Sequence, residues 1–106
     1  MPRFQIDYIS PALRDLEKLN PSIAREVLRK IEHVAQNPLA TNEGGYGHPL
    51  SGVLAGFFKI KLLSRGLRVV YKLKKVEGKM LIIVIAARAD GEVYKIAEQR
   101  IHRLKI

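Results

Sequence analysis

Apolar and basic residues alternate along residues 57–74, with one interruption at Ser64-Arg65-Gly66. The alternation predicts two β-strands joined by a tight turn. Because successive side chains of a strand point to opposite faces, Lys59 and Lys61 are expected to share one face of a sheet. The apolar side chains on either side of them are expected to point into a core.

The length of this turn decides whether Arg68, on the second strand, joins the two lysines. An even number of loop residues would place Lys61 directly across from Arg68, whereas a three-residue loop would put them on opposite faces. The even case gives three cations on one face, and like charges on neighbouring strands are mildly destabilising. Such a cluster is either a solvated sheet face of a basic protein or a site for a polyanion.

The remaining pattern predicts two helices before this hairpin. Residues 3–9 are typical of a short strand. Ser10-Pro11 and Asn20-Pro21 are helix start signals, and Asn37-Pro38 ends the second helix. So short a break between the two helices predicts a helical hairpin. Residues 39–56 hold five glycines and Pro49 without a clear period, which predicts a loop.

An apolar stretch over residues 80–88 predicts a buried central strand after a turn at 77–79. A three-residue loop there would set Arg88 opposite Arg68. Asp90 or Gly91 then caps a final amphipathic helix over residues 92–104. The predicted order is β-α-α-β-β-β-α in a single α+β domain covering residues 1–106. Its mostly antiparallel four-stranded sheet packs with the N-terminal helical hairpin and the C-terminal helix.

Composition narrows the class of protein. The chain has no cysteine, which excludes a disulfide scaffold and a thiolate metal site. No apolar run approaches a membrane span and no signal peptide is evident, so a cytoplasmic protein is expected. Nineteen Lys and Arg against ten Asp and Glu give a net charge of +9. This excess favours nucleic acid, an acidic protein or an anionic membrane surface as partner.

Familiar catalytic and metal motifs are absent from the sequence. His33, His48 and His102 are scattered, with no carboxylate or second histidine at ligand spacing, so no metal or cofactor is expected. The chain has no serine nucleophile elbow and no phosphate loop. The remaining candidates are basic and phenolic: Lys59, Lys61, Arg68, Arg88 and Tyr94.

Cations gathered at one end of a sheet suit phosphodiester chemistry. A phosphodiester that passes through a pentacoordinate state gathers negative charge on its equatorial oxygens, and preorganised cations stabilise that state. RNA supplies its own nucleophile, the 2′-hydroxyl. Its cleavage therefore needs proton transfer and charge stabilisation, without a metal ion.

Several runs of the sequence resemble the RelE family of bacterial type II toxins, within the RelE/ParE superfamily. They are Leu50-Ser51-Gly52, Gly56-Phe57-Phe58-Lys59-Ile60-Lys61-Leu62, Gly66-Leu67-Arg68-Val69-Val70-Tyr71, and Arg88 followed by Glu92-Val93-Tyr94. The likeness spans nearly the whole chain. One departure is Ala89-Asp90-Gly91, where more basic residues would be expected.

The resemblance implies a ribosome-dependent endoribonuclease that cuts mRNA in the decoding site and is held inactive by an acidic, RelB-like antitoxin. It implies an active site of Lys59, Lys61, Arg68, Arg88 and Tyr94. Lys61 would be the general base, Lys59 and Arg68 would stabilise the phosphorane, Arg88 would assist the leaving group, and Tyr94 would orient the nucleotide. Two alternatives stay open: a ParE-like inhibitor of DNA gyrase, and a basic binding module without catalysis.

Overall fold

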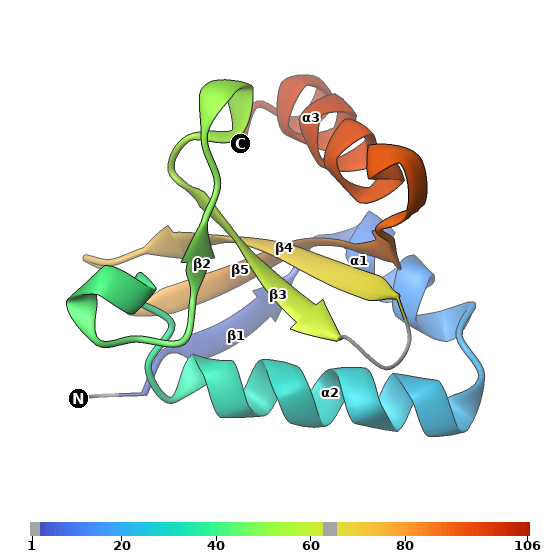
Figure 1. The fold of residues 1–106 in the computed structure, drawn as a ribbon, viewed down its shortest axis with the longest axis horizontal. Coiled ribbons are helices and arrows are strands. Elements are labelled where there is room, and N and C mark those ends of the chain that lie inside the picture. The colour runs from blue at the N-terminus through green and yellow to red at the C-terminus, as the bar shows by residue number, and fades with distance from the viewer. Residues whose placement is uncertain (1–2, 63–65) are drawn as a thin grey trace.

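The computed structural model describes residues 3–62 and 66–106, which fold into one α+β unit with three α-helices and a five-stranded sheet (Figure 1). The sheet order is β1-β5-β4-β3-β2. Its strands are β1 (Gln5–Tyr8), β2 (His48–Pro49), β3 (Phe57–Leu62), β4 (Leu67–Lys74) and β5 (Lys79–Ala87). The helices are α1 (Ser10–Glu17), α2 (Pro21–Ala35) and α3 (Glu92–Leu104). No helix of the described ranges is long and apolar enough to cross a membrane.

The prediction of an α+β fold with a mostly antiparallel sheet is confirmed, but the number of strands is wrong. The segment that was expected to be all loop contains β2, which pairs antiparallel with β3 at the edge of the sheet. A two-residue strand that contains a proline shows no alternation in the sequence. The pairing of β1 with β5 is parallel, while β3, β4 and β5 pair antiparallel as predicted.

The sheet is covered on both faces. One face packs against α1 and α2 in a core cluster that includes Ala12, Val27, Ile31, Ile60 and Tyr71. The other face packs against α3 in a smaller cluster that includes Phe57, Val70, Val84, Val93 and Ala97. The alternation along β3 accounts for this division, because Ile60 belongs to the first cluster and Phe57 to the second.

The helix starts largely follow the predicted signals. Asn20 caps α2, because its side chain accepts a hydrogen bond from the backbone N–H of Ser22 at 3.0 Å. Ser10 does not cap α1 as expected, since the helix already begins at Ser10 and its cap position is Ile9. Gly91 occupies the cap position of α3 with a φ of 68°, a left-handed conformation that glycine adopts at little cost.

The hairpin register agrees with the even-loop prediction, because Leu62 pairs with Leu67 and Lys61 with Arg68. Ser64 and Arg65, the centre of the predicted turn, lie outside the described residues. The register between β4 and β5 shifts between Val70 and Tyr71, where a β-bulge places an additional residue in β5.

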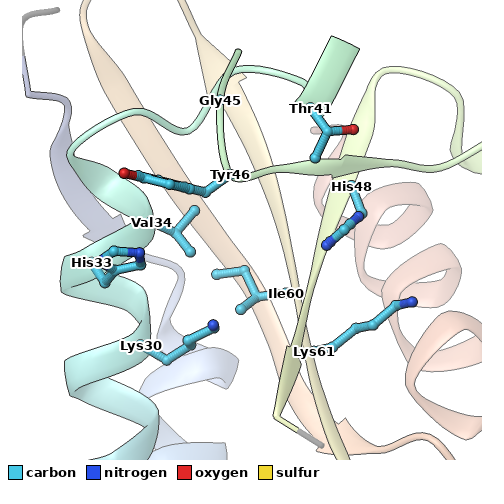
Figure 2. Close-up of a pocket in the computed structure, with 9 residues that line it drawn as sticks. All are labelled: Lys30, His33, Val34, Thr41, Gly45, Tyr46, His48, Ile60 and Lys61. Atoms are coloured by element: carbon cyan, nitrogen blue, oxygen red, sulfur yellow. The ribbon is translucent and has the colours of Figure 1, made fainter. Parts of the chain in front are cut away.

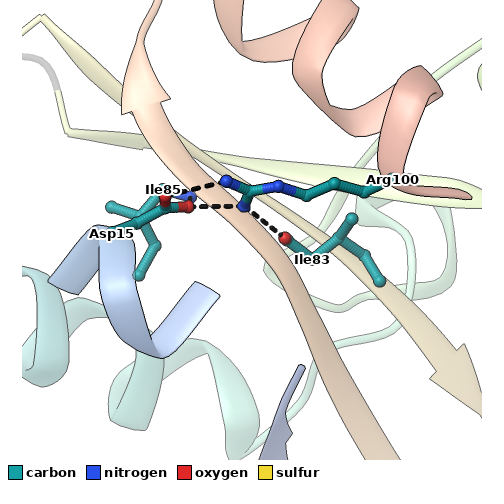
Figure 3. A network of polar contacts seen from close by, with 4 residues as sticks. All are labelled: Asp15, Ile83, Ile85 and Arg100. Carbon is teal, nitrogen blue, oxygen red and sulfur yellow. Dashed lines mark hydrogen bonds and ion pairs between the residues drawn. The ribbon is translucent and has the colours of Figure 1, made fainter. Parts of the chain in front are cut away.

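A largely buried polar network lies at this bulge (Figure 3). Arg100 of α3 forms a bidentate ion pair with Asp15 of α1, through Nη1–Oδ2 at 2.6 Å and Nη2–Oδ1 at 2.9 Å. Arg100 Nη1 also donates to the Ile83 carbonyl at 3.0 Å, and the Ile85 N–H donates to Asp15 Oδ2 at 3.0 Å. The strand β1 pairs with β5 only as far as Ile82. The side chains of Asp15 and Arg100 therefore provide hydrogen-bond partners for backbone groups of β5 that lie beyond the end of β1. The network therefore joins α1, β5 and α3.

Candidate active site

Three of the predicted cations lie on the β3–β4 hairpin, on the sheet face that α3 partly covers. Lys61 pairs with Arg68, and Lys59 lies two pairs further along β3, between Val70 on one side and His48 of β2 on the other. Alternation therefore brings the three side chains to one face, as the sequence predicts. Lys59 and Lys61 are half-buried.

Arg68 is buried, with only 7% of its surface exposed. Its Nη1 donates to the carbonyl of Leu67 at 2.9 Å, and its Nε has no hydrogen-bond partner among the described residues. A guanidinium has five N–H donors, and a buried donor without an acceptor is costly. Arg68 therefore keeps a buried, unsatisfied donor directly across from Lys61.

Arg88 follows β5 and begins a single 3₁₀ turn, Ala89–Gly91. The prediction that it lies opposite Arg68 is wrong, because Arg68 pairs with Ala86. The cause is the turn, which occupies residues 75–78 instead of 77–79 and would by itself pair Arg68 with Ile85. The bulge adds one residue to β5 and so moves the partner of Arg68 to Ala86. The Arg88 N–H donates to the Gly66 carbonyl at 2.9 Å, which keeps Arg88 at the hairpin end of the sheet with an exposed side chain.

Tyr94 lies in the first turn of α3 and is half-buried. It packs against the core cluster beneath α3, together with Leu50 and Ile96. The structure therefore brings Lys61, Arg68 and Arg88 together at one end of the sheet. Lys59 extends this cluster along β3, and Tyr94 lies in the first turn of the helix that follows Arg88, with no recorded contact to the cations among the described residues.

Nothing in the sequence pattern predicted that His48 belongs to this region. It lies on β2 opposite Lys59. Burial and, after it, the positive charges of Lys61, Lys59 and Lys30 lower the pKa of His48 below its usual value. The imidazole is therefore mostly neutral at pH 7 and can both accept and donate a hydrogen bond. His48 could have been placed in this region only if β2 had been predicted, because the pairing of β2 with β3 brings His48 there.

A pocket of about 300 Å³ opens beside Lys61, between α2, the loop before β2 and the outer edge of β3 (Figure 2). Its floor includes Val34 and Ile60. Lys30, His33 and Tyr46 line the side toward α2, and His48 and Lys61 line the opposite side. The pocket therefore adjoins the cation cluster across a single strand.

The loop over residues 38–47 is shaped by backbone hydrogen bonds. The Thr41 N–H donates to the Gly47 carbonyl at 2.8 Å, and the Gly47 N–H donates to the Leu39 carbonyl at 2.9 Å. Beneath the loop, the hydroxyl of buried Tyr71 donates to the Pro38 carbonyl at 2.8 Å, and burial raises the pKa of Tyr71. A Cβ at Gly47 would lie 2.2 Å from the Tyr71 hydroxyl oxygen, so this position has room only for glycine.

The described part of the chain contains no group of three or more His, Asp or Glu side chains placed to hold a metal ion. The chemistry that this region offers comes from cations: two lysines, a buried arginine and an exposed arginine. Such a set can bind a phosphodiester and stabilise the charge that develops on it.

Comparisons with known proteins agree with this fold. No protein-family model matches the sequence. The mRNA interferase toxin RelE of Escherichia coli K12 is 28% identical over 96 residues, covering 91% of this chain and 95% of the relative. The structure of a mutant of E. coli RelE in the free state matches with a TM-score of 0.77 and 26% identity, over 94% of this chain and 99% of that one.

The toxin–antitoxin complex RelBE2 of Mycobacterium tuberculosis contains a chain that matches with a TM-score of 0.69 and 29% identity. The match covers 85% of this chain and 97% of that one. These likenesses in sequence and structure extend over nearly the full length of each protein. In sequence and in fold, this chain is therefore similar to toxins of the RelE family.

Proposed function

We propose that this protein is the toxin of a toxin–antitoxin pair and an endoribonuclease that cleaves mRNA in the decoding site of the ribosome. The observation that supports this most strongly is the pairing of Lys61 with a buried Arg68 whose Nε has no partner among the described residues. Like charges placed side by side are costly in the free protein, and a bound phosphodiester compensates for them. The name of the E. coli relative, mRNA interferase toxin, supports the same reaction.

The reaction begins with proton transfer. The unprotonated amine of Lys61 takes the proton of the ribose 2′-hydroxyl as general base, and the 2′-oxygen attacks the adjacent phosphorus. The bond from phosphorus to the 5′-oxygen then breaks. The leaving 5′-oxygen takes up a proton from the solvent, so the products are a 2′,3′-cyclic phosphate and a 5′-hydroxyl, and the attack needs neither a water nucleophile nor a metal ion.

The other residues act on charge and geometry. Arg68 and Lys59 stabilise the equatorial oxygens of the phosphorane, Arg68 through its planar donors and Lys59 as a point charge. Arg88, exposed at the same end of the sheet, stabilises the negative charge that develops on the 5′-oxygen as it leaves and becomes protonated. Tyr94 orients the nucleotide from the first turn of α3. The ribosome supplies the remaining alignment of the mRNA.

Dependence on the ribosome is the first test of this proposal. A defined mRNA is incubated with the protein, with and without purified ribosomes, and cuts are mapped by primer extension. We expect cuts only with ribosomes, because the ribosome supplies the alignment of the mRNA on which the reaction depends. The 3′-ends should carry a cyclic phosphate. Equal cutting of free mRNA would contradict the ribosome dependence. A complete absence of cutting would contradict the proposed activity and favour the alternative of a DNA gyrase inhibitor, which an assay of DNA supercoiling by gyrase would then test.

An acidic, RelB-like antitoxin is proposed as the partner that neutralises this toxin. The net charge of +9 and the antitoxin present in the M. tuberculosis RelBE2 complex support this proposal. We expect the product of the neighbouring reading frame to co-purify with this chain and to suppress ribosomal mRNA cleavage at an equimolar ratio. Free expression of the chain without any partner, with no effect on growth, would contradict it.

A further inference from the structure

The pocket beside Lys61 lies where the chain next to the scissile phosphate would continue. Arg68 lies on the β4 side of Lys61, and the pocket lies on the other side, where β2 has ended. In Figure 2 the ammonium group of Lys61 points away from α2, so the lysine borders the pocket mainly with its aliphatic stem. An RNA strand whose phosphate contacts the Lys61 ammonium group can therefore place a neighbouring nucleotide in the pocket.

Aromatic rings form one wall of this pocket. The rings of His33 and Tyr46 lie 4.4 Å apart between centroids, at an interplanar angle of 32°. Tyr46 is 45% exposed, and its ring borders the pocket (Figure 2). Stacking of a base on an exposed aromatic ring is a common element of single-strand recognition.

The charge and polarity of the pocket also fit one nucleotide. Lys30 projects from α2 with its ammonium group toward the floor at Ile60 (Figure 2). Neutral His48 and the hydroxyl of Thr41 offer hydrogen bonds to base edges, and none of the described lining residues is acidic. The volume of about 300 Å³ lies at the lower end of the range for small-molecule sites.

The wall that carries Tyr46 is formed before any ligand binds. The Tyr46 N–H donates to the Asn37 carbonyl at 2.9 Å. A Cβ at the neighbouring Gly45 would lie 2.1 Å from the Leu39 carbonyl oxygen, so the backbone is closely packed on both sides of the tyrosine. A preformed site loses little conformational entropy on binding.

We propose that this pocket is a nucleotide subsite that binds the RNA residue adjoining the scissile phosphate. Its base stacks on Tyr46, and its phosphate pairs with Lys30. This inference rests on the proposed function for the identity of its ligand. The subsite would hold the strand in register over Lys61 and so contribute to the choice of the bond that is cut.

Binding of a trinucleotide that cannot be cleaved tests the subsite apart from catalysis. The ligand carries 2′-O-methyl groups in place of the attacking hydroxyls, and NMR titration of the full chain follows the His33 and His48 resonances. We expect Tyr46→Ala to weaken binding about 10-fold and Tyr46→Phe to bind like the unmodified protein, because the stacking face is kept. Lys30→Gln should lower the slope of log affinity against log salt by about 0.7, whereas Lys75→Gln, in the remote β4–β5 turn, should not.

Three results would overturn the subsite. They are normal trinucleotide binding by Tyr46→Ala, binding of inorganic phosphate as tight as that of the trinucleotide, and resonance changes confined to other parts of the protein. If the protein cuts mRNA but Tyr46→Ala binds normally, the subsite is wrong and the proposed function stands. If the trinucleotide binds in the pocket but mRNA is never cut, the subsite stands and the proposed function is wrong.

Discussion

Replacing Lys61 with alanine is expected to slow ribosome-dependent mRNA cleavage by about 10²- to 10⁴-fold, the usual contribution of a general base. Protein stability should stay the same or rise slightly, because the substitution removes a like-charge pair with Arg68. Single-turnover cleavage at saturating protein measures the first effect, and urea unfolding measures the second. Loss of activity without loss of stability is what distinguishes a catalytic lysine from a structural one.

The matched control is Lys74→Ala. Lys74 lies at the far end of β4 and also faces a cation across the sheet, Lys79 of β5. It therefore reproduces the charge change and a cross-strand cationic neighbour at a place remote from the proposed site. Cleavage by Lys74→Ala should match that of the unmodified protein. Normal cleavage by Lys61→Ala would show that Lys59 and Lys61 only form a charged sheet face and that Lys61 has no catalytic role.

Replacing Arg100 with alanine is expected to destabilise the fold by about 3–5 kcal/mol, the cost of breaking a largely buried ion pair by removing one partner. The variant leaves the Asp15 carboxylate without its bidentate partner and the Ile83 carbonyl without its donor. Both groups lie at the bulge of β5, so the packing of α1 and α3 should weaken together. Urea unfolding followed by circular dichroism measures the change in the free energy of unfolding.

The exposed pair between Lys79 and Asp7, at 3.7 Å, is the control for this prediction. Asp7→Ala should change stability by about 0–1 kcal/mol, as solvent screens such a pair. Replacing Asp15 and Arg100 together should cost less than the sum of the two single changes, because neither charge is left alone. An Arg100→Ala protein as stable as Asp7→Ala would show that the network contributes little.

The sequence predicted the parts of the site that depend on short-range alternation. The shared face of Lys59 and Lys61 follows from the period of a strand, and the pairing of Lys61 with Arg68 follows from an even turn. The capping of α2 by Asn20 was also predictable from the sequence, because the capping signal is local. These features need no knowledge of tertiary contacts.

Other parts of the site depend on contacts between distant segments. Arg88 was placed opposite the wrong residue because the β4–β5 turn begins two residues earlier than the sequence pattern indicated, and the bulge in β5 leaves no signal in an unbroken apolar run. The strand β2 exists only through its pairing with β3, so His48 and the pocket beside it were not predictable. The burial of Arg68 and the pairing of Asp15 with Arg100, 85 residues apart, likewise arise only in the folded chain.

The most direct measurement of the central claim is cleavage of an mRNA with a single 2′-deoxy substitution. The deoxynucleotide stands on the 5′ side of the bond that is cut in the decoding site, and primer extension maps the products on purified ribosomes. We predict that cleavage disappears at this bond and persists on the all-ribose mRNA, because the nucleophile has been removed. Undiminished cleavage at the deoxynucleotide would contradict attack by the 2′-hydroxyl and, with it, the role proposed for Lys61.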